Sequence, residues 1–337
     1  MCESENAMKL TRRNFLTAGG AAAMVGAAGC RAGSNMSADR DFILSPDGRK
    51  LILPWTGLKS DVRVWVAGDT HFGMYDERDA QYADNYRRMS WQGKGYAETV
   101  RTHKAAFETM LANAKKEKID LLLLVGDIIS FPTLANVEYV TNALKTSGVD
   151  WMYVAGNHDW HFEGDAGSDL EQRDRWIERR LRPFYPADAN PLMYSRVVKG
   201  IRFVAIDNSA YLIRREQLDF WDAEVAKGDP VVLLMHIPLF AEGWGVLTCG
   251  CPDWNAANDP YWEIERREKW RKEGPTPETF AFRETVLSAP NLVGVFTGHF
   301  HVPMCAHLRG QNVFSVVSGD EGRFLDARIG WPHRREM

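Results

Sequence analysis

Val62-Arg63-Val64-Trp65-Val66-Ala67 is a short apolar run that is followed at once by Gly68-Asp69-Thr70-His71. Further runs of this kind occur at 119–125, 151–155, 201–206, 231–235 and 292–297. Stretches with a helical pattern lie between several of them, at 96–115, 137–145, 170–181 and 214–227. Nearly continuous apolar strands that alternate with helices indicate an α/β fold, with a mostly parallel sheet covered on both faces.

Polar residues that can bind metal ions follow five of these six runs. They are Asp69, His71, Asp127, Asn157, His158, Asp159, His236, His299 and His301. Ligand sites of open α/β sheets lie at the carboxyl ends of the strands, so we expect these side chains to meet there. Imidazole, carboxylate and amide donors without a thiolate suit Mn, Fe or Zn. The donors are too many for one ion, which predicts two metal ions that share a carboxylate.

Local spacing supports a common site. In Asp69-Thr70-His71 and His299-Phe300-His301 the outer residues are two apart, so in an extended segment they point the same way. A glycine precedes Asp69, Asp127, Asn157 and His299, which allows a sharp turn and a close approach of the backbone. Any one of these polar residues alone is more simply explained as a satisfied polar group. The complete ordered set is not.

The blocks Asp-x-His, Gly-Asp, Gly-Asn-His-Asp, His and Gly-His-x-His occur in this order from Asp69 to His301. With them the sequence resembles the calcineurin-like metallophosphoesterase superfamily. The resemblance implies a four-layer α/β/β/α sandwich with a two-metal site at one edge. It implies one metal ion held by Asp69, His71 and His301, a second held by Asn157, His236 and His299, and Asp127 as the bridge between them.

The resemblance also implies a hydrolase. His158 would donate a proton to the leaving oxygen or stabilise charge on phosphorus, and we expect Asp159 to orient the His158 ring. A metal-bound hydroxide would take the place of a protein nucleophile. The expected substrate is a small phosphate ester, preferably a phosphodiester. A phosphomonoesterase of the same fold and a non-catalytic binding scaffold are the alternatives.

Two insertions are candidates for contacts with the substrate. Residues 72–95 carry Arg87 and Arg88, which suit a second phosphate or an acidic group, unless they belong to a solvated charged loop. Residues 241–289 form a cap that contains Trp244, Trp254 and Trp262. Trp244 is a candidate for stacking on a base, sugar or lipid headgroup, and the alternative is an ordinary packed cap.

Residues 1–30 resemble an export signal of the twin-arginine type. Arg12-Arg13-Asn14-Phe15-Leu16 precedes an apolar stretch of small residues that ends in Ala27-Ala28-Gly29-Cys30. We therefore expect passage through the twin-arginine machinery to the periplasm or cell envelope. Cys30 is either the lipidated residue of a lipoprotein, and thus the membrane contact, or marks simple cleavage. Translation starts at Met1 or at Met8.

The rest of the chain predicts one metallophosphoesterase domain at 61–337, after a linker with a short strand pair at 31–60. The turn of that pair is Ser45-Pro46-Asp47-Gly48. With 337 residues, 45% of them hydrophobic, the chain can bury a large core. Its net charge of −4 gives no support for a nucleic-acid-binding surface. Cys249, Cys251 and Cys305 fit no metal site, and we expect ordinary cysteines.

Overall fold

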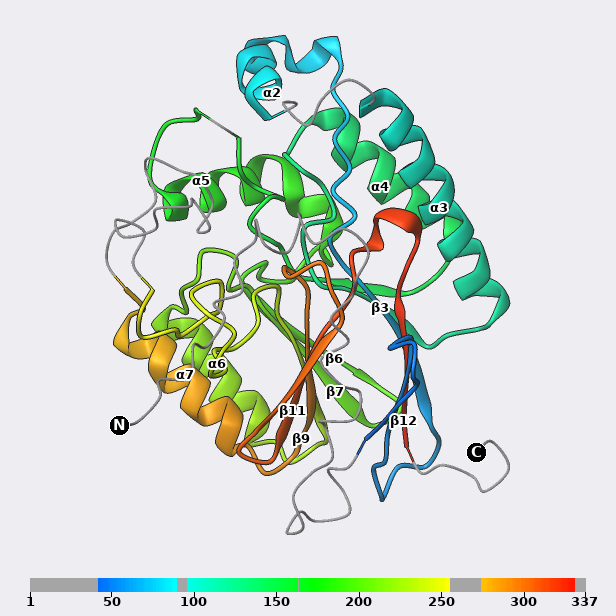
Figure 1. Cartoon of the computed structure of the whole chain (residues 1–337), viewed down its shortest axis with the longest axis vertical. Helices are drawn as coiled ribbons and strands as arrows, with labels where there is room; N and C mark the ends of the chain where they lie inside the picture. The colour runs from blue at the N-terminus through cyan, green and yellow to red at the C-terminus, as the bar shows by residue number, and fades with distance from the viewer. Residues whose placement is uncertain (1–41, 90–95, 163, 255–273, 331–337) are drawn as a thin grey trace, which may run out of the picture.

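Two six-stranded mixed sheets form the centre of the computed structural model, which describes residues 42–89, 96–162, 164–254 and 274–330 (Figure 1). The strands of the first sheet run in the order β1 (Ile43–Leu44), β2 (Lys50–Leu53), β12 (Leu325–Ile329), β3 (Val62–Ala67), β4 (Leu121–Leu124) and β5 (Trp151–Tyr153). Those of the second run in the order β10 (Met304–Leu308), β11 (Gln311–Ser315), β9 (Leu292–Thr297), β8 (Val231–Leu234), β7 (Ile201–Ile206) and β6 (Met193–Val198).

Most neighbouring strands in each sheet are parallel. β3, β4 and β5 pair in parallel, and so do β7, β8, β9 and β11. The register pairs Ala67 with Leu124 and Leu124 with Tyr153, so the loops after these three strands leave the first sheet side by side. In the second sheet Leu234 pairs with Phe296, which brings the loops after β8 and β9 together. The sheet topology thus gathers the strand ends on which the expected site lies.

Helices cover the outer faces of both sheets. α3 (Tyr96–Lys116) and α4 (Leu134–Ser147) lie on one side of the molecule, and α6 (Arg215–Val225) and α7 (Pro277–Ser288) lie on the other (Figure 1). Between them the sheets face each other: a Cβ added at Gly294 of β9 would lie 3.6 Å from Leu53 of β2. All residues of β4 and β8 are buried, as their unbroken apolar sequences predict. The expected four-layer α/β/β/α sandwich is confirmed.

Local sequence signals set several helix ends. The hydroxyl of Thr276 accepts the backbone N–H of Thr279, and Pro277 takes the first helical position of α7. Thr133 caps α4 in the same way at Asn136, and Gly148 ends that helix in the left-handed conformation. These caps fix where the helices begin relative to the strands they cover.

The structure differs from the sequence predictions in two places and adds detail in a third. The apolar pattern predicted one sheet, but the strands form two. We placed the domain boundary at residue 61, whereas β1 and β2 belong to the first sheet because β2 pairs with β12. The segment 72–95 holds a 3-10 helix (Glu77–Tyr82) and α2 (Ala83–Met89) in its described part. The charged stretch 261–272, whose sequence also indicates a helix, lies outside the described residues.

The remaining short elements connect these layers. α5 (Asp169–Trp176) runs on into a π-helical turn (Ile177–Leu181) and a 3-10 turn (Arg182–Phe184), and a last 3-10 turn spans Gly319–Glu321. Cys249 and Cys251 are buried and Cys305 is half-buried, and none of the three forms a disulfide in the described part of the chain. No helix in the described part of the chain is long and apolar enough to cross a membrane.

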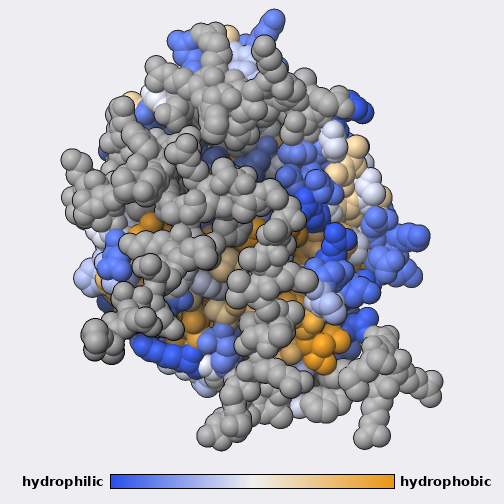
Figure 2. Space-filling view, viewed as in Figure 1, coloured by the Kyte–Doolittle hydropathy of each residue, from blue (hydrophilic) through white to orange (hydrophobic). Residues whose placement is uncertain are grey.

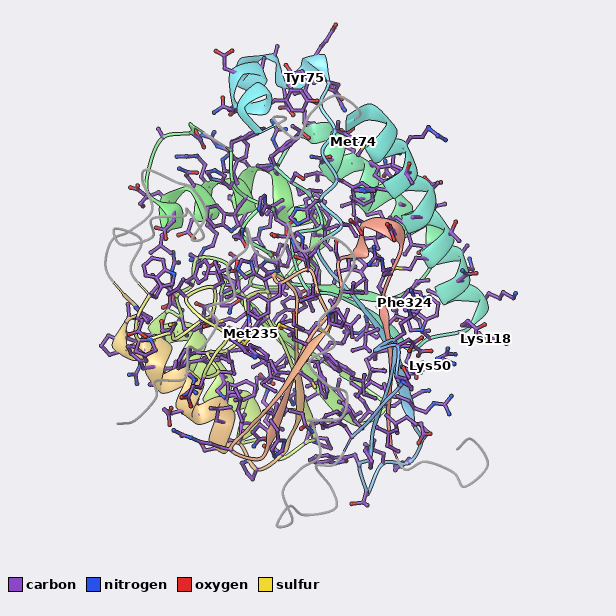
Figure 3. All side chains as sticks on the ribbon, in the orientation of Figure 1. Lys50, Met74, Tyr75, Lys118, Met235 and Phe324 are labelled. Atoms are coloured by element: carbon purple, nitrogen blue, oxygen red, sulfur yellow. The ribbon has the colours of Figure 1, made fainter. Side chains whose placement is uncertain are left out.

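Charged and apolar residues separate as the layers require. Hydrophilic residues gather along the side of α3 on the face drawn in Figure 2. In Figure 3, Lys118 lies at the outer end of α3, while Met235, directly after β8, lies inside the molecule and is fully buried. Phe324, directly before β12, stacks on Trp65 of β3 with ring centroids 3.7 Å apart. This contact covers the first sheet beside β12.

Candidate metal centre

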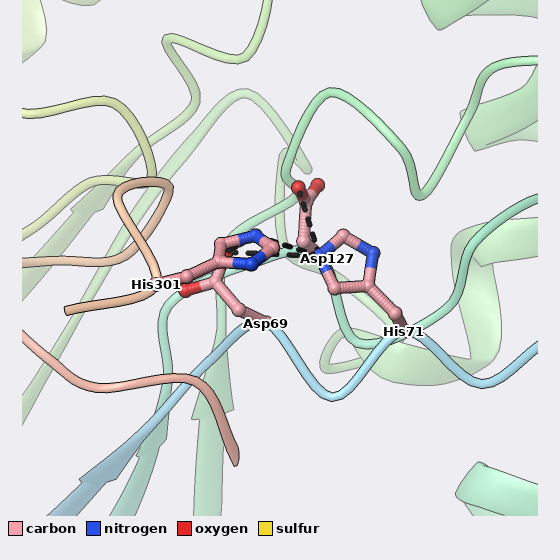
Figure 4. A group of neighbouring side chains, drawn as sticks. All are labelled: Asp69, His71, Asp127 and His301. Atoms are coloured by element: carbon pink, nitrogen blue, oxygen red, sulfur yellow. Dashed lines mark hydrogen bonds and ion pairs between the residues drawn. The ribbon is translucent and has the colours of Figure 1, made fainter. Parts of the chain in front are cut away.

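Four side chains from three strand ends form a first group of potential metal ligands. Asp69 and His71 follow β3, Asp127 follows β4 and His301 follows β9, and their side chains point toward one another (Figure 4). The Nε2 atoms of His71 and His301 are 3.0 Å apart. His301 Nε2 is 3.4 Å from Asp69 Oδ1, and His71 Nε2 is 3.8 Å from Asp127 Oδ2. The group therefore joins residues of both sheets.

A second group shares Asp127 with the first. It contains Asp127, His236 and His299, all buried, with ligand atoms close enough for one ion. His236 Nε2 lies 3.2 Å from Asp127 Oδ2 and 3.0 Å from Asn157 Oδ1, which adds the buried amide of Asn157 to the group. Because Asp127 Oδ2 faces both His71 and His236, this oxygen stands between the two groups. The structure thus brings together all seven residues in the grouping that the resemblance implied.

The donor chemistry of the second group fits a metal ion. His236 Nδ1 lies 2.8 Å from the carbonyl oxygen of Val125, and a carbonyl can only accept, so Nδ1 carries a proton. In the neutral ring, Nε2 then presents a lone pair to two oxygens that are also acceptors. Three acceptors this close together repel one another unless a cation lies between them. Imidazole, carboxylate and amide oxygen are ligands that Zn, Mn and Fe accept.

The charges of the site also favour a bound cation. Burial lowers the pKa of His236, but the charge of Asp127, its hydrogen bond to the ring and the charge of Asp69 together outweigh burial and raise the pKa to about 10. Burial also raises the pKa of Asp127, yet the imidazoles of His236, His158 and His71 hold it well below the ordinary value for an aspartate. The carboxylates therefore draw in positive charge, from protons when no metal ion is present.

Backbone strain is concentrated here. Nine described residues other than glycine have a positive φ, and six of them are at this site: Asp69, His71, Asp127, Tyr211, His299 and His301. Residues other than glycine rarely adopt this conformation, and it persists where the surrounding structure enforces it. In the Asp-x-His and His-x-His segments, both outer residues take this left-handed form rather than the extended one assumed from sequence.

Two glycines allow the strand-end loops to approach. A Cβ at Gly126 would lie 2.6 Å from both the backbone nitrogen of Gly156 and His236 Nδ1, and φ there is +85°. A Cβ at Gly156 would lie 2.2 Å from Asp127 Oδ1. Both distances are shorter than real Cβ contacts, so a side chain at either position would displace Asp127 or His236. The prediction that these glycines serve close approach is confirmed.

The sequence model of the calcineurin-like phosphoesterase family matches residues 62–303, a range that contains all seven candidate ligands. The chain belongs to this family. Among curated relatives, a probable cyclic nucleotide phosphodiesterase of Psychrobacter sp. (strain PRwf-1) is 23% identical over 222 residues, which cover 64% of this chain and 56% of that protein. A second, from Psychrobacter arcticus, is 23% identical over 218 residues, covering 63% and 68%. The chain thus spans little more than half of the first relative's length.

A solved structure shares the fold. A dimetal phosphatase from Danio rerio matches with a TM-score of 0.50 at 12% identity, covering 80% of this chain and 99% of that chain. This similarity concerns the arrangement of strands and helices only. Together with the family match, it agrees with the two packed sheets seen here.

The two residues expected to act beside the metal ions have different surroundings. His158 is half-buried; its ring lies edge-on to that of His71, with centroids 4.8 Å apart, and its backbone N–H donates to Asp127 Oδ1. Asp159 is fully buried, and its oxygens accept the backbone N–H groups of Asp127, Ile129 and Gly156 at 2.7–2.9 Å. Burial and the charge of Asp127 raise the pKa of Asp159 to about 7, while the N–H donors act in the opposite direction. We expected Asp159 to orient the His158 ring; in the structure its hydrogen bonds join the two loops that carry Asp127 and Asn157.

Three residues that support the candidate ligands were missed in the sequence analysis. Asn208 Oδ1 accepts the backbone N–H groups of His236 and Ile237, and Tyr211 hydrogen-bonds His299. The Ser318 hydroxyl donates to the carbonyl of Asp69. Asn208 lies two residues after the run 201–206, so the rule that found the ligands would also have found it. Tyr211 and Ser318 belong to no such pattern.

The predicted substrate contacts lie in different places. Arg87 and Arg88 belong to α2, but their side chains are outside what the structure describes. Trp244 is half-buried and meets Phe300 edge to face at 5.5 Å. Phe300 stands between the two ligands His299 and His301, so Trp244 lies next to the metal centre. Trp254 is buried and packed against Tyr211, as in an ordinary cap, and Trp262 lies outside the described residues.

Proposed function

We propose that the chain hydrolyses phosphoric esters with two metal ions held at the strand ends of both sheets. The observation that carries this is the pair of ligand groups that share Asp127. When bound, two such ions supply positive charge for the phosphoryl oxygens and activate water. Mn, Fe and Zn all suit the donors, and metal analysis will identify the ions.

The side chains of the site have different roles in the proposed reaction. Asp127 keeps the two groups at a fixed separation, because its Oδ2 faces His71 on one side and His236 on the other. His158 stands beside His71, with its backbone held by Asp127 Oδ1, so its ring is kept next to the first group. From there it can deliver a proton to the leaving oxygen or hold one near the phosphoryl group.

A preference for diesters with an aromatic substituent is the finer part of the proposal. Trp244 and Phe300 form an aromatic wall next to His299 and His301, and aromatic rings favour flat partners such as a nucleobase. The two Psychrobacter relatives are named as probable cyclic nucleotide phosphodiesterases, whose substrates are diesters that carry a base. Both observations support a diester, and the alternative is a phosphomonoester.

Two chromogenic substrates test the proposal. The full-length chain is loaded with Mn or Zn and assayed on bis(p-nitrophenyl) phosphate and p-nitrophenyl phosphate, with cyclic adenosine monophosphate as the natural diester. We expect turnover that a chelator abolishes and a higher kcat/KM for the diester. A higher value for the monoester would make the protein a phosphatase. No turnover with two ions bound would favour the binding scaffold.

We also propose that residues 1–30 direct export to the periplasm or cell envelope through the twin-arginine machinery. The support is the sequence alone, since these residues lie outside the described part of the chain. Arg12→Lys together with Arg13→Lys should leave the protein in the cytoplasm, as fractionation would show. Cys30→Ser should release it from the membrane fraction if Cys30 is lipidated. Unimpeded export of the double lysine variant would contradict the assignment.

A further inference from the structure

Tyr211 contacts a metal-centre histidine from outside the set of ligands. It lies beyond the end of β7, is 1% exposed, and its hydroxyl is 2.8 Å from Nε2 of His299. The rings of the two residues meet edge to face with centroids 5.7 Å apart. No block of the family motif contains Tyr211, and nothing in the sequence pattern marked it.

This hydrogen bond decides which nitrogen of His299 can bind a metal ion. Tyr211 occupies Nε2, so the nitrogen left for coordination is Nδ1. A coordinating nitrogen must offer its lone pair, which places the proton of the ring on Nε2, where it is donated to the Tyr211 oxygen. With a metal ion on Nδ1, the hydroxyl accepts the Nε2 proton, so the contact fits the neutral form of His299 that such a site requires. Hydrogen bonds of this kind to metal-bound histidines orient the ring and strengthen binding.

His236 offers a comparison within the same group. Its Nδ1 donates to the Val125 carbonyl, which leaves Nε2 facing Asp127 and Asn157. The two histidines of the second group are thus held through opposite ring nitrogens, His236 through Nδ1 and His299 through Nε2. For His236 the hydrogen-bond partner is a backbone carbonyl. For His299 it is a side chain, which can be changed by substitution.

Tyr211 is itself firmly placed. Its φ of +58° puts it in the left-handed conformation, and its backbone N–H donates to the carbonyl of Asn208 at 2.8 Å. The ring of the buried Trp254 lies against its own, with centroids 5.8 Å apart. A strained conformation that is enforced from two sides is a common property of residues that hold a functional site.

We propose that Tyr211 is a positioning residue of the second metal group: it holds His299 with Nδ1 toward Asp127 and His236. The inference rests on the proposed function in one respect, that this group binds a metal ion. Tyr211 acts through His299 and not on the reacting atoms. Its loss should therefore weaken one metal site and leave the other unchanged.

Metal titration of the full-length chain tests this directly. Tyr211→Phe keeps the ring and removes only the hydroxyl. Competition of Zn²⁺ between the protein and a chromogenic chelator should show one of two sites weakened roughly 10- to 100-fold, with the other site as in the wild type. At saturating metal, kcat should return close to the wild-type value. Two sites of wild-type affinity, or a kcat that stays low when both sites are filled, would overturn the proposal.

Tyr194→Phe is the matched control. Tyr194 is also buried, but its hydroxyl bonds the backbone N–H and carbonyl of Tyr153, both at 2.8 Å. Its removal should lower the melting temperature and leave both metal affinities unchanged. This comparison separates the loss of a buried hydroxyl from the loss of the bond to His299.

If the Tyr211→Phe protein fails to fold, a measurement on the wild type still tests the inference. In the zinc-loaded chain with isotope-labelled histidine, nitrogen shifts should report His299 as metal-bound at Nδ1 and protonated at Nε2. Coordination through Nε2 would overturn the inference. Two tightly bound ions without hydrolysis would contradict the proposed function, and this test could still be made. A wild type that binds no metal would contradict both the proposed function and the inference about Tyr211.

Discussion

Asp127 combines three properties that make it the central residue of the site. It is 1% exposed, it has a φ of +52°, and one of its oxygens faces a histidine of each ligand group. A residue held in so unfavourable a conformation costs about 1–3 kcal/mol, which the rest of the fold must offset. Because the surrounding imidazoles keep its pKa low, the carboxylate stays charged near neutral pH and is prepared for cations.

At His158 we predict a loss of turnover without a loss of metal. His158→Ala should bind both ions as the wild type does and lower kcat by about 100- to 10,000-fold, the usual contribution of a general acid. The loss should be smaller for p-nitrophenyl esters than for alkyl esters, because nitrophenolate leaves without help. Steady-state rates and metal analysis of the same preparation check this. Full activity of the variant on alkyl esters would contradict the role given to His158.

Among the elements, the loops after β4 and β5 depend on a single buried carboxylate. Asp159 accepts N–H groups from both loops, at Asp127 and Ile129 in one and at Gly156 in the other. In Asp159→Asn the amide group would face one or more of these donors. We expect a loss of about 1–3 kcal/mol in the free energy of unfolding, measured in urea without metal, and weaker metal binding.

Asp79→Asn is a control of the same kind away from the metal groups. Asp79 is equally buried and accepts the backbone N–H of Leu134 and a hydrogen bond from Arg180. The Asp79→Asn variant should have a lower free energy of unfolding and an unchanged metal affinity. A normal stability and metal affinity of Asp159→Asn with a reduced kcat would restore the expectation that Asp159 orients His158.

The aromatic wall beside the second ligand group should contribute to substrate choice. Trp244→Ala removes the ring that contacts Phe300, and we expect kcat/KM for cyclic adenosine monophosphate to fall about tenfold relative to a small aliphatic diester. The control is Trp221→Phe, a change to a tryptophan that packs on Phe282 between α6 and α7. If both substrates lose the same factor in Trp244→Ala, the wall has no part in recognising the base.

For the whole molecule, metal ions at this site would tie the two sheets together. Asp69, His71, Asp127 and Asn157 come from the first sheet, and His236, His299 and His301 come from the second. Ligand binding stabilises the folded state by about 4 kcal/mol when the free ligand exceeds its Kd 1,000-fold. A chelator should therefore lower the melting temperature of the wild type by several degrees in calorimetry. Asp127→Asn should melt at the same temperature with and without chelator, and a chelator effect of wild-type size would contradict a shared site.

The family resemblance predicted the four-layer sandwich, and the strand ends predicted which residues would lie together. Strand ends are local signals, so Asp69, Asp127 and His236 could be placed without knowing the order of the strands. The division into two sheets depends on pairings such as β2 with β12, between residues nearly three hundred positions apart, and apolar runs carry no such information. Tyr211 could not be predicted, because its contact with His299 joins the loop after β7 to the loop after β9 and neither sequence specifies it.

Anomalous diffraction from crystals of the metal-loaded protein tests the central claim most directly. The account predicts two peaks roughly 3.5–4 Å apart, both within bonding distance of the Asp127 carboxylate. One peak should be bounded by Asp69, His71 and His301, and the other by Asn157, His236 and His299. A single ion, or ions that do not contact Asp127, would contradict it.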